Sequence, residues 1–158
     1  MKLEERFRHS RGYGVHSPFL YKVVREAMMP RRVATTTPLL REELVALGVG
    51  RRTAVRLQNY LDIAQHTCWA IDTAEGGAKG TLFVATPDCP LGIVAQMTER
   101  CSRENDTIAT LCVIHRRGRK QKEWRRRLVA EHKGMSAEKP HFTLLFFNPA
   151  LPKQHIII

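Results

Sequence analysis

The sequence has no long apolar run and few cysteines, and each shortage excludes a class of protein. A membrane-spanning helix needs about 20 consecutive apolar residues, and the 158-residue chain contains no such run. Residues 1–8 are charged where a signal peptide would need an apolar centre. We therefore expect a protein that does not span a membrane and that resides in the cytoplasm.

Four cysteines are present, and no two of them form a C-x-x-C pair. They are Cys68, Cys89, Cys101 and Cys112. Their spacing fits neither a zinc site nor a disulfide framework, so we expect reduced and mostly buried thiols. His66 and Cys68 are two residues apart. Without two further ligands this pair does not make a metal site, and no metal is expected.

Positive charge is what the chain has in excess, and it is unevenly distributed. The formal net charge is +11 at pH 7. Residues 1–32 contribute +5, residues 33–115 contribute −2, and residues 116–158 contribute +8. A strongly basic surface attracts polyanions and raises the rate of encounter with them at low salt. Nucleic acid or another polyanion is therefore an expected partner, and a basic pI without a specific partner is the alternative.

Three helices are predicted in the first part of the chain. Two Ser/Thr-Pro pairs, each an N-cap followed by proline at the first helical position, predict helices over 18–29 and 38–47. Apolar residues at helical spacing predict a third helix over about 51–65. Residues 1–66 are thus expected to form a polar arm followed by a helical layer.

After residue 66 the apolar pattern changes to strands that alternate with helices. This alternation predicts a mainly parallel sheet, here with an antiparallel pair formed by the last two strands. The expected fold is a single α/β domain over 1–158, with a small mixed sheet of about five strands and helices on both faces. Strands are expected at 68–72, 81–86, 107–114, 142–147 and 155–158, and helices at about 90–101 and 119–132.

Two segments near the ends of the chain carry a family resemblance. Residues 11–19 read Arg-Gly-Tyr-Gly-Val-His-Ser-Pro-Phe, and residues 146–155 read Phe-Phe-Asn-Pro-Ala-Leu-Pro-Lys-Gln-His. Together they resemble the ends of bacterial class I methyltransferase-like proteins that use S-adenosylmethionine. The order strand, basic helix, strand, strand in the last third is similar to the same part of that fold. The resemblance implies a truncated, Rossmann-like methyltransferase fold, because a typical catalytic member is considerably longer.

The cofactor loop of that family has a weak counterpart here. A catalytic member would carry Glu/Asp-x-Gly-x-x-x-Gly after its first strand, where the glycines let the backbone approach the cofactor. The corresponding segment, residues 72–80, reads Asp-Thr-Ala-Glu-Gly-Gly-Ala-Lys-Gly. It leads directly into the strand expected at 81–86 instead of into a helix. A hairpin-like connection that holds no ligand is therefore the preferred interpretation.

Two functions follow from the resemblance. The preferred one is a degenerate methyltransferase-like protein that is not catalytic, needs no cofactor and binds phosphate-bearing or acidic partners through a basic face. The alternative is an active S-adenosylmethionine-dependent methyltransferase that acts on a small molecule or on nucleic acid. Asp88 then has a second interpretation, as the N-cap of the following helix. In the alternative, the resemblance implies a cofactor site made of Asp72, Gly76, Gly77 and Asp88.

The most basic part of the chain is the segment 116–127, which carries 8 basic residues and one acidic residue. It begins where the expected central strand ends and enters the first turns of the next helix. Ligands of open α/β sheets bind outside the carboxyl ends of the strands. Cations at a helix N-terminus are disfavoured by about 0.3–1 kcal/mol each, a cost that a bound anion would offset. The alternative is a solvated helix face. The residues expected to bind phosphate are Arg116, Arg117, Arg119 and Lys120.

His115 is the candidate catalytic residue because it directly follows the expected central strand. A histidine with an unperturbed pKa near 6.5 suits the role of general base. His16 is interpreted either as a residue that holds the arm in place or as part of the mouth of a ligand cleft. The apolar run Ile156–Ile158 at a sheet edge is expected to be paired or covered, which predicts a homodimer through this edge strand.

Overall fold

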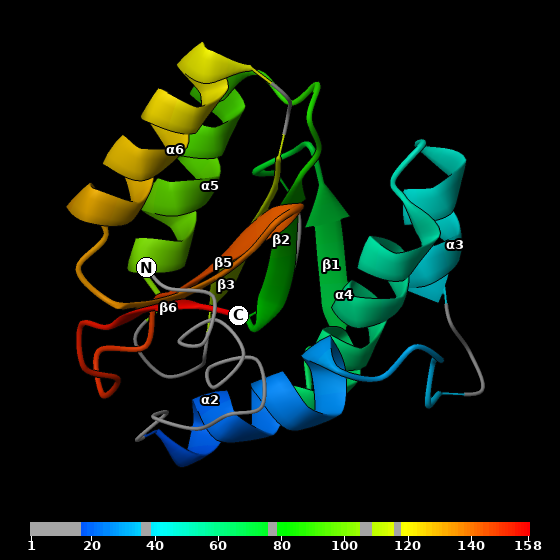
Figure 1. Ribbon diagram of the computed structural model, residues 1–158. Coiled ribbons are helices and arrows are strands. Elements are labelled where there is room, and N and C mark those ends of the chain that lie inside the picture. The colour runs from blue at the N-terminus through cyan, green and yellow to red at the C-terminus, as the bar shows by residue number, and fades with distance from the viewer. Residues whose placement is uncertain (1–16, 36–38, 76–78, 105–108, 116–117) are drawn as a thin grey trace. The chain divides into compact units, whose positions relative to one another are not determined.

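The computed structural model describes residues 17–35, 39–75, 79–104, 109–115 and 118–158 (Figure 1). The chain divides into two compact units. One contains the residues up to His66 together with Ile157 and Ile158, and the other contains Thr67–Ile156. No helix within the described ranges combines the length and apolar character needed to cross a bilayer.

The first unit is helical, and its described elements are α2 (Pro18–Lys22), η1 (Val23–Met28), α3 (Leu39–Ala46) and α4 (Arg51–Ile63). These elements confirm the predicted helices. Ser17 caps α2, since its Oγ accepts a hydrogen bond from the Leu20 N–H at 3.3 Å. In η1 the Met29 N–H donates to the Val24 carbonyl at 3.1 Å, which is the five-residue spacing of a π-helix. The first predicted helix therefore continues to Met28 but widens in its second half.

The second unit is α/β. Its six-stranded sheet has the order β1-β2-β3-β5-β4-β6, in which β1, β2 and β3 are parallel and β5 is antiparallel to both β3 and β4. The strands are β1 (Cys68–Ile71), β2 (Thr81–Ala85), β3 (Thr110–Ile114), β4 (Met135–Lys139), β5 (Phe142–Phe146) and β6 (His155–Ile157). The helices are α5 (Leu91–Ser102) and α6 (Arg119–Glu131). The mixed sheet confirms the predicted α/β class.

Two predictions about the strands are wrong. The sheet has six strands instead of about five, because β4 forms from Met135–Lys139, where no strand is predicted. The last two strands are not an antiparallel pair, because β4 lies between β5 and β6. The strand β5 pairs instead with β3 on one side and with β4 on the other. Pairing with an apolar neighbour outweighs the weak β-propensity of the β4 residues.

The connection between β1 and β2 also differs from the prediction. The two strands are parallel, with Cys68 opposite Thr81 and Ile71 opposite Val84, so residues 72–80 do not form a hairpin. Parallel neighbours are usually joined by a crossover of a dozen or more residues, commonly containing a helix. This connection is shorter. It places Asp72 at the carboxyl end of β1 and Gly80, with φ of 84°, just before β2.

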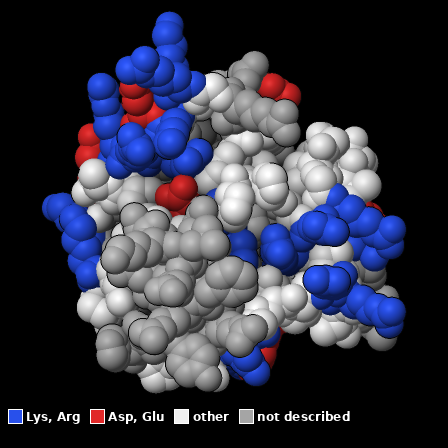
Figure 2. All heavy atoms as spheres, viewed as in Figure 1, with Lys and Arg blue, Asp and Glu red and all other residues white. Residues whose placement is uncertain are grey.

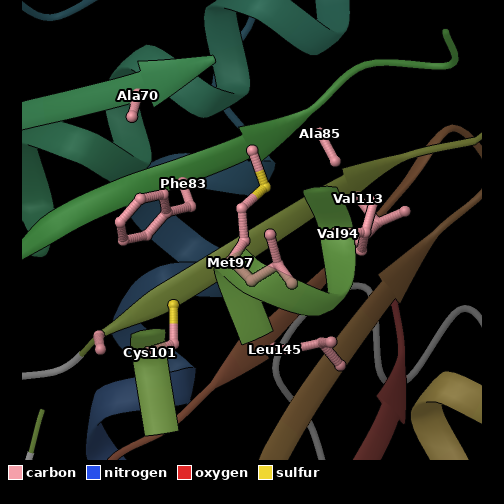
Figure 3. Close-up of a cluster of buried hydrophobic side chains, with 10 residues drawn as sticks. Ala70, Phe83, Ala85, Val94, Met97, Cys101, Val113 and Leu145 are labelled. Atoms are coloured by element: carbon pink, nitrogen blue, oxygen red, sulfur yellow. The ribbon is translucent and has the colours of Figure 1, made fainter. Parts of the chain in front are cut away.

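Helices α5 and α6 cover one face of the sheet. Figure 3 shows Met97, Val94 and Cys101 of α5 directed toward the strands. Together with alternate residues of the strands, these side chains form a buried hydrophobic cluster. Trp124 and Leu128 of α6 pack against this cluster. The intervening strand residues are buried as well, which explains the continuous apolar runs in the sequence. That helices also cover the opposite face stays a prediction. The strand residues of the cluster are Ala70, Phe83, Ala85, Leu111, Val113 and Leu145.

Candidate functional site

A pocket of about 250 Å³ lies at the carboxyl ends of β2 and β3. One wall follows β2 through the segment 86–90 into the start of α5, and another is the end of β3 at Ile114 and His115. The inner side of α6 closes it with Gln121, Trp124 and Arg125. This is the position at which ligands of open α/β sheets bind. We therefore take this pocket and the adjoining helix α6 as the candidate site.

The Asp72 carboxylate is held by Thr86. Its Oδ1 accepts a hydrogen bond from the Thr86 N–H at 2.7 Å, and its Oδ2 accepts one from the Thr86 hydroxyl at 2.6 Å. Asp72 has a φ of 53°, in the left-handed region that aspartate tolerates better than most residues. These contacts tie the end of β1 to the segment that follows β2. Asp72 does not line the pocket.

The other residues implied for a cofactor are distributed differently. Asp88 is exposed and lines the pocket. It does not cap α5, because the helix begins at Leu91 with Pro90 in the N-cap position. Gly76 and Gly77 lie outside the described residues. Of the two implied cofactor residues with described positions, Asp88 lies at the pocket and Asp72 lies outside it.

Cys89 also lines the pocket, but its thiol is poorly reactive. Burial raises the pKa of Cys89 to about 12, and the nearby Asp72 carboxylate adds to this effect. A thiol with so high a pKa stays protonated at neutral pH and is a weak nucleophile. The four cysteines are all free thiols, two of them buried and two half-buried.

His115 lies at the pocket with both ring nitrogens engaged. Its Nδ1 is 3.1 Å from the Pro140 carbonyl oxygen, and because a carbonyl accepts, this nitrogen carries the proton. Its Nε2 then accepts a hydrogen bond from the Thr143 hydroxyl at 2.8 Å. Burial lowers the pKa of His115 to about 4. The expected unperturbed pKa is therefore wrong, and His115 lacks the available lone pair that a general base needs.

An ion pair that the sequence did not predict forms one wall of the pocket. Arg125 has a side chain that is 15% exposed, and it donates to Glu138 of β4 at 3.2 Å. The second carboxylate oxygen of Glu138 lies 3.5 Å from Nε2 of His155. A hydrogen bond from His155 and the charge of Arg125 lower the pKa of Glu138. Arg125 thus lines the pocket, and the Glu138 carboxylate compensates its charge.

The outer side of α6 carries a different set of cations. In Figure 2 basic side chains gather at the upper left, over α6. Arg119 is 93% exposed in its side chain and pairs with Glu123 at 3.3 Å. Within the described ranges, no ion pair is recorded for the four other exposed cations of the helix. We call these residues the cationic face of α6: Lys120, Lys122, Arg126 and Arg127.

The structure describes the positions of two of the four predicted phosphate-binding residues. Arg119 and Lys120 are exposed in the first turn of α6, where the prediction put them. Arg116 and Arg117 lie outside the described residues. Gly118, with a φ of 131°, precedes the helix and allows the sharp entry into it. Lys122, Arg126 and Arg127 extend the exposed charge along the helix.

Among the residues with described positions, no three His, Cys, Asp or Glu side chains gather as a metal site would require. Ile156 and Ile158 are buried. A homodimer through β6 stays a prediction.

Comparison with known protein families, with curated proteins and with solved structures gives no match to this chain. Its function must therefore be inferred from its own residues.

Proposed function

We propose that the protein binds nucleic acid through the cationic face of α6 and that it is a degenerate, non-catalytic relative of class I methyltransferases. The observation that carries the binding proposal is the set of exposed cations on that face, which form no ion pair with any residue that the structure describes. Lys122 and Arg126 are four residues apart on the helix, so their like charges repel one another. Lys120 and Lys122 also lie in the first turns, where positive charge opposes the helix dipole. A bound chain of phosphates would relieve both costs.

The dimensions of the face support a phosphate chain over a single small anion. The cations span Lys120 to Arg127, and a helix rises about 1.5 Å per residue, so they extend over about 10 Å of the helix axis. Phosphates along one nucleic-acid strand recur about every 3.4 Å of duplex axis. Several phosphates can therefore contact this face at once.

The methyltransferase-like fold is supported by the segment from β3 to β5. In it, a strand leads through the basic helix α6 to the antiparallel pair β4 and β5. The described residues do not fit S-adenosylmethionine, because Asp72 is held by Thr86. The pocket of about 250 Å³ is also smaller than the roughly 300–1,000 Å³ typical of cofactor sites. We therefore favour binding without methyl transfer. The cytoplasmic location stays a prediction.

A salt titration with matched variants tests nucleic-acid binding. Fluorescence anisotropy with a labelled DNA duplex would be measured for the unchanged protein, for Lys120→Gln/Lys122→Gln and for Arg51→Gln/Arg52→Gln. Both double variants remove two exposed charges from the first turn of a helix, in α6 and in α4 respectively. They are therefore matched in net charge and in position relative to a helix dipole.

The α6 variant should reduce the slope of log K against log salt by about 1.8, since each phosphate contact contributes about 0.9. The α4 variant should leave that slope unchanged. Equal losses in the two variants would show that net charge alone attracts the DNA. A shallow salt dependence in the unchanged protein would contradict phosphate binding altogether.

Calorimetry with S-adenosylmethionine and S-adenosylhomocysteine separates the alternative. We expect no binding heat at about millimolar ligand, well above the concentrations at which enzymes usually work. Saturable binding of either molecule would favour an active methyltransferase.

A further inference from the structure

A second pocket, of about 590 Å³, lies at the end of the sheet opposite the candidate site. The last turns of α5 and α6 form one side, at Ser102 and Leu128. The end of β5 and the segment 147–151 form the other. Its volume falls within the range typical of small-molecule sites. Five of the twelve lining residues have apolar side chains: Leu128, Leu145, Phe147, Pro149 and Leu151.

His132 brings a fixed imidazole to this apolar pocket. Its Nε2 lies 3.1 Å from the Met135 carbonyl oxygen and 2.9 Å from the Phe146 carbonyl oxygen. Both are acceptors, so the proton is on Nε2. The ring packs edge-on against Phe147, with centroids 4.7 Å apart. A Cβ at Gly134 would lie 2.4 Å from the Phe146 oxygen and 2.9 Å from Nε2, so the ring position requires glycine there.

This tautomer leaves a lone pair on His132 Nδ1. Within the described part of the chain no group donates a hydrogen bond to it. Burial lowers the pKa of His132, so the ring is neutral at neutral pH and Nδ1 remains an acceptor. His132 lines the pocket. The pocket is therefore lined by a fixed, neutral imidazole whose Nδ1 can accept a hydrogen bond.

The remaining polar groups of the pocket do not favour a charged ligand. Glu131 and Lys133 at its edge carry opposite charges. The Thr98 and Ser102 hydroxyls donate to carbonyls of their own helix at 2.8 and 2.7 Å. The Asn148 Oδ1 accepts from the Ala150 N–H at 2.8 Å, which leaves its amide N–H groups as donors. A ligand thus meets five apolar side chains, the His132 imidazole, the Asn148 amide donors and two hydroxyls whose protons are already engaged.

We propose that this pocket binds a small, uncharged, flat aromatic molecule whose N–H or O–H group donates to His132 Nδ1. An apolar body matches the leucine, proline and phenylalanine walls, and removing it from water supplies most of the affinity. The single donor sets the orientation, because the two carbonyl contacts of Nε2 hold the His132 ring and its Nδ1 in a fixed position. This pocket does not include the cationic face of α6, so the site is independent of the proposed nucleic-acid binding.

Indole and 1-methylindole are suitable probes, because they share a flat apolar body and differ in the N–H donor. Binding to the full chain would be followed by backbone amide shifts in two-dimensional NMR. Indole should shift the amides of pocket residues such as Leu128 and Leu145, with a Kd of about 0.1–1 mM, as expected of a fragment. It should bind about threefold to tenfold more tightly than 1-methylindole, which is the effect of one net hydrogen bond.

Three variants complete the test. Leu151→Trp fills the pocket from its half-buried edge and should weaken indole binding by about tenfold or more, through loss of the apolar contact area. Leu47→Trp is the matched control, because Leu47 is 58% exposed and lies outside the pocket. His132→Phe should abolish the preference for indole. Since His132→Phe also removes two hydrogen bonds and can unfold the chain, Leu151→Trp provides the decisive comparison.

Equal affinity for the two probes in the unchanged protein would overturn the role of His132 Nδ1. Unchanged indole binding in Leu151→Trp, or absence of amide shifts at the pocket up to about 5 mM indole, would overturn the site itself.

Discussion

Replacing Asp72 with alanine separates a structural role of its carboxylate from a role in ligand binding. The substitution removes two hydrogen bonds to Thr86, at 2.7 and 2.6 Å, in which the acceptor is charged. Such bonds contribute about 1.5–3 kcal/mol each, and the lower value applies to this half-buried site. Alanine at a φ of 53° costs up to about 2 kcal/mol more, because aspartate tolerates this conformation better. We expect Asp72→Ala to lower the free energy of unfolding by about 3–5 kcal/mol.

Two companion variants divide this loss into its parts. Asp72→Asn keeps a side chain that tolerates the left-handed conformation and can still accept from the Thr86 N–H, so it should lose about 1–2 kcal/mol. Asp72→Gly relieves the backbone strain but keeps neither hydrogen bond, so it should fall between the other two variants. The order of stability should therefore be Asn, Gly, Ala.

Thermal and urea unfolding, followed by circular dichroism, would measure the series. A loss of 3–5 kcal/mol corresponds to a fall in Tm of about 6–20 °C for a chain of this size. Unfolding of Asp72→Ala at the temperature of the unchanged protein would refute the structural role. If that variant also lost binding to S-adenosylmethionine shown by the unchanged protein, the carboxylate would have to be assigned to the ligand.

Three further predictions concern single residues. The pKa of His115 is about 4 in the folded chain and near 6.5 when unfolded, so the unfolded chain binds more protons between these values. Stability should therefore fall by about 1–2 kcal/mol as pH drops from 6.5 to 4, a value reduced for the partial exposure of His115 to solvent, and His115→Gln should flatten this part of the urea-unfolding profile. Gly134→Ala should lower the free energy of unfolding by about 1–3 kcal/mol, because its Cβ would meet the Phe146 oxygen at 2.4 Å; an unchanged urea midpoint would contradict this. Cys89 should resist iodoacetamide at pH 7.5, as measured by peptide mass spectrometry, and Asp72→Asn should speed its alkylation by lowering the thiol pKa. Rapid alkylation of Cys89 in the unchanged protein would contradict the raised pKa.

The predicted features that the structure confirms depend on local signals. The helices over 18–29 and 38–47 follow from Ser/Thr-Pro pairs, whose capping geometry involves residues three or four apart. The helix expected at about 119–132 is present as α6, in which Trp124 and Leu128, four residues apart, pack against the hydrophobic cluster. Such signals are complete within a short stretch of sequence, so no knowledge of the rest of the chain is needed.

The features that were missed depend on partners distant in sequence. His115 has its pKa lowered by a burial that the strand order produces, and its Nε2 partner Thr143 is 28 residues away. The strand β4 has only two apolar residues, Met135 and Ala137, and weak β-propensity, and it forms in register with β5. The pairing of Arg125 with Glu138 joins a helix to a strand. The spacing of residue types along the chain predicts local structure, and it does not identify contacts between residues that are far apart in sequence.

The position of β5 has a consequence for the order in which the protein can be made. The strand lies between β3 and β4, although the ribosome synthesises it after both. Until residues 142–146 emerge, β3 and β4 cannot be joined through it, and each has an unpaired edge. Neighbouring strands are about 4.8 Å apart, so the missing strand leaves a gap of about twice that distance. Exposed strand edges promote aggregation. The edge of β3 is therefore open to pairing with other chains until its antiparallel neighbour has been synthesised.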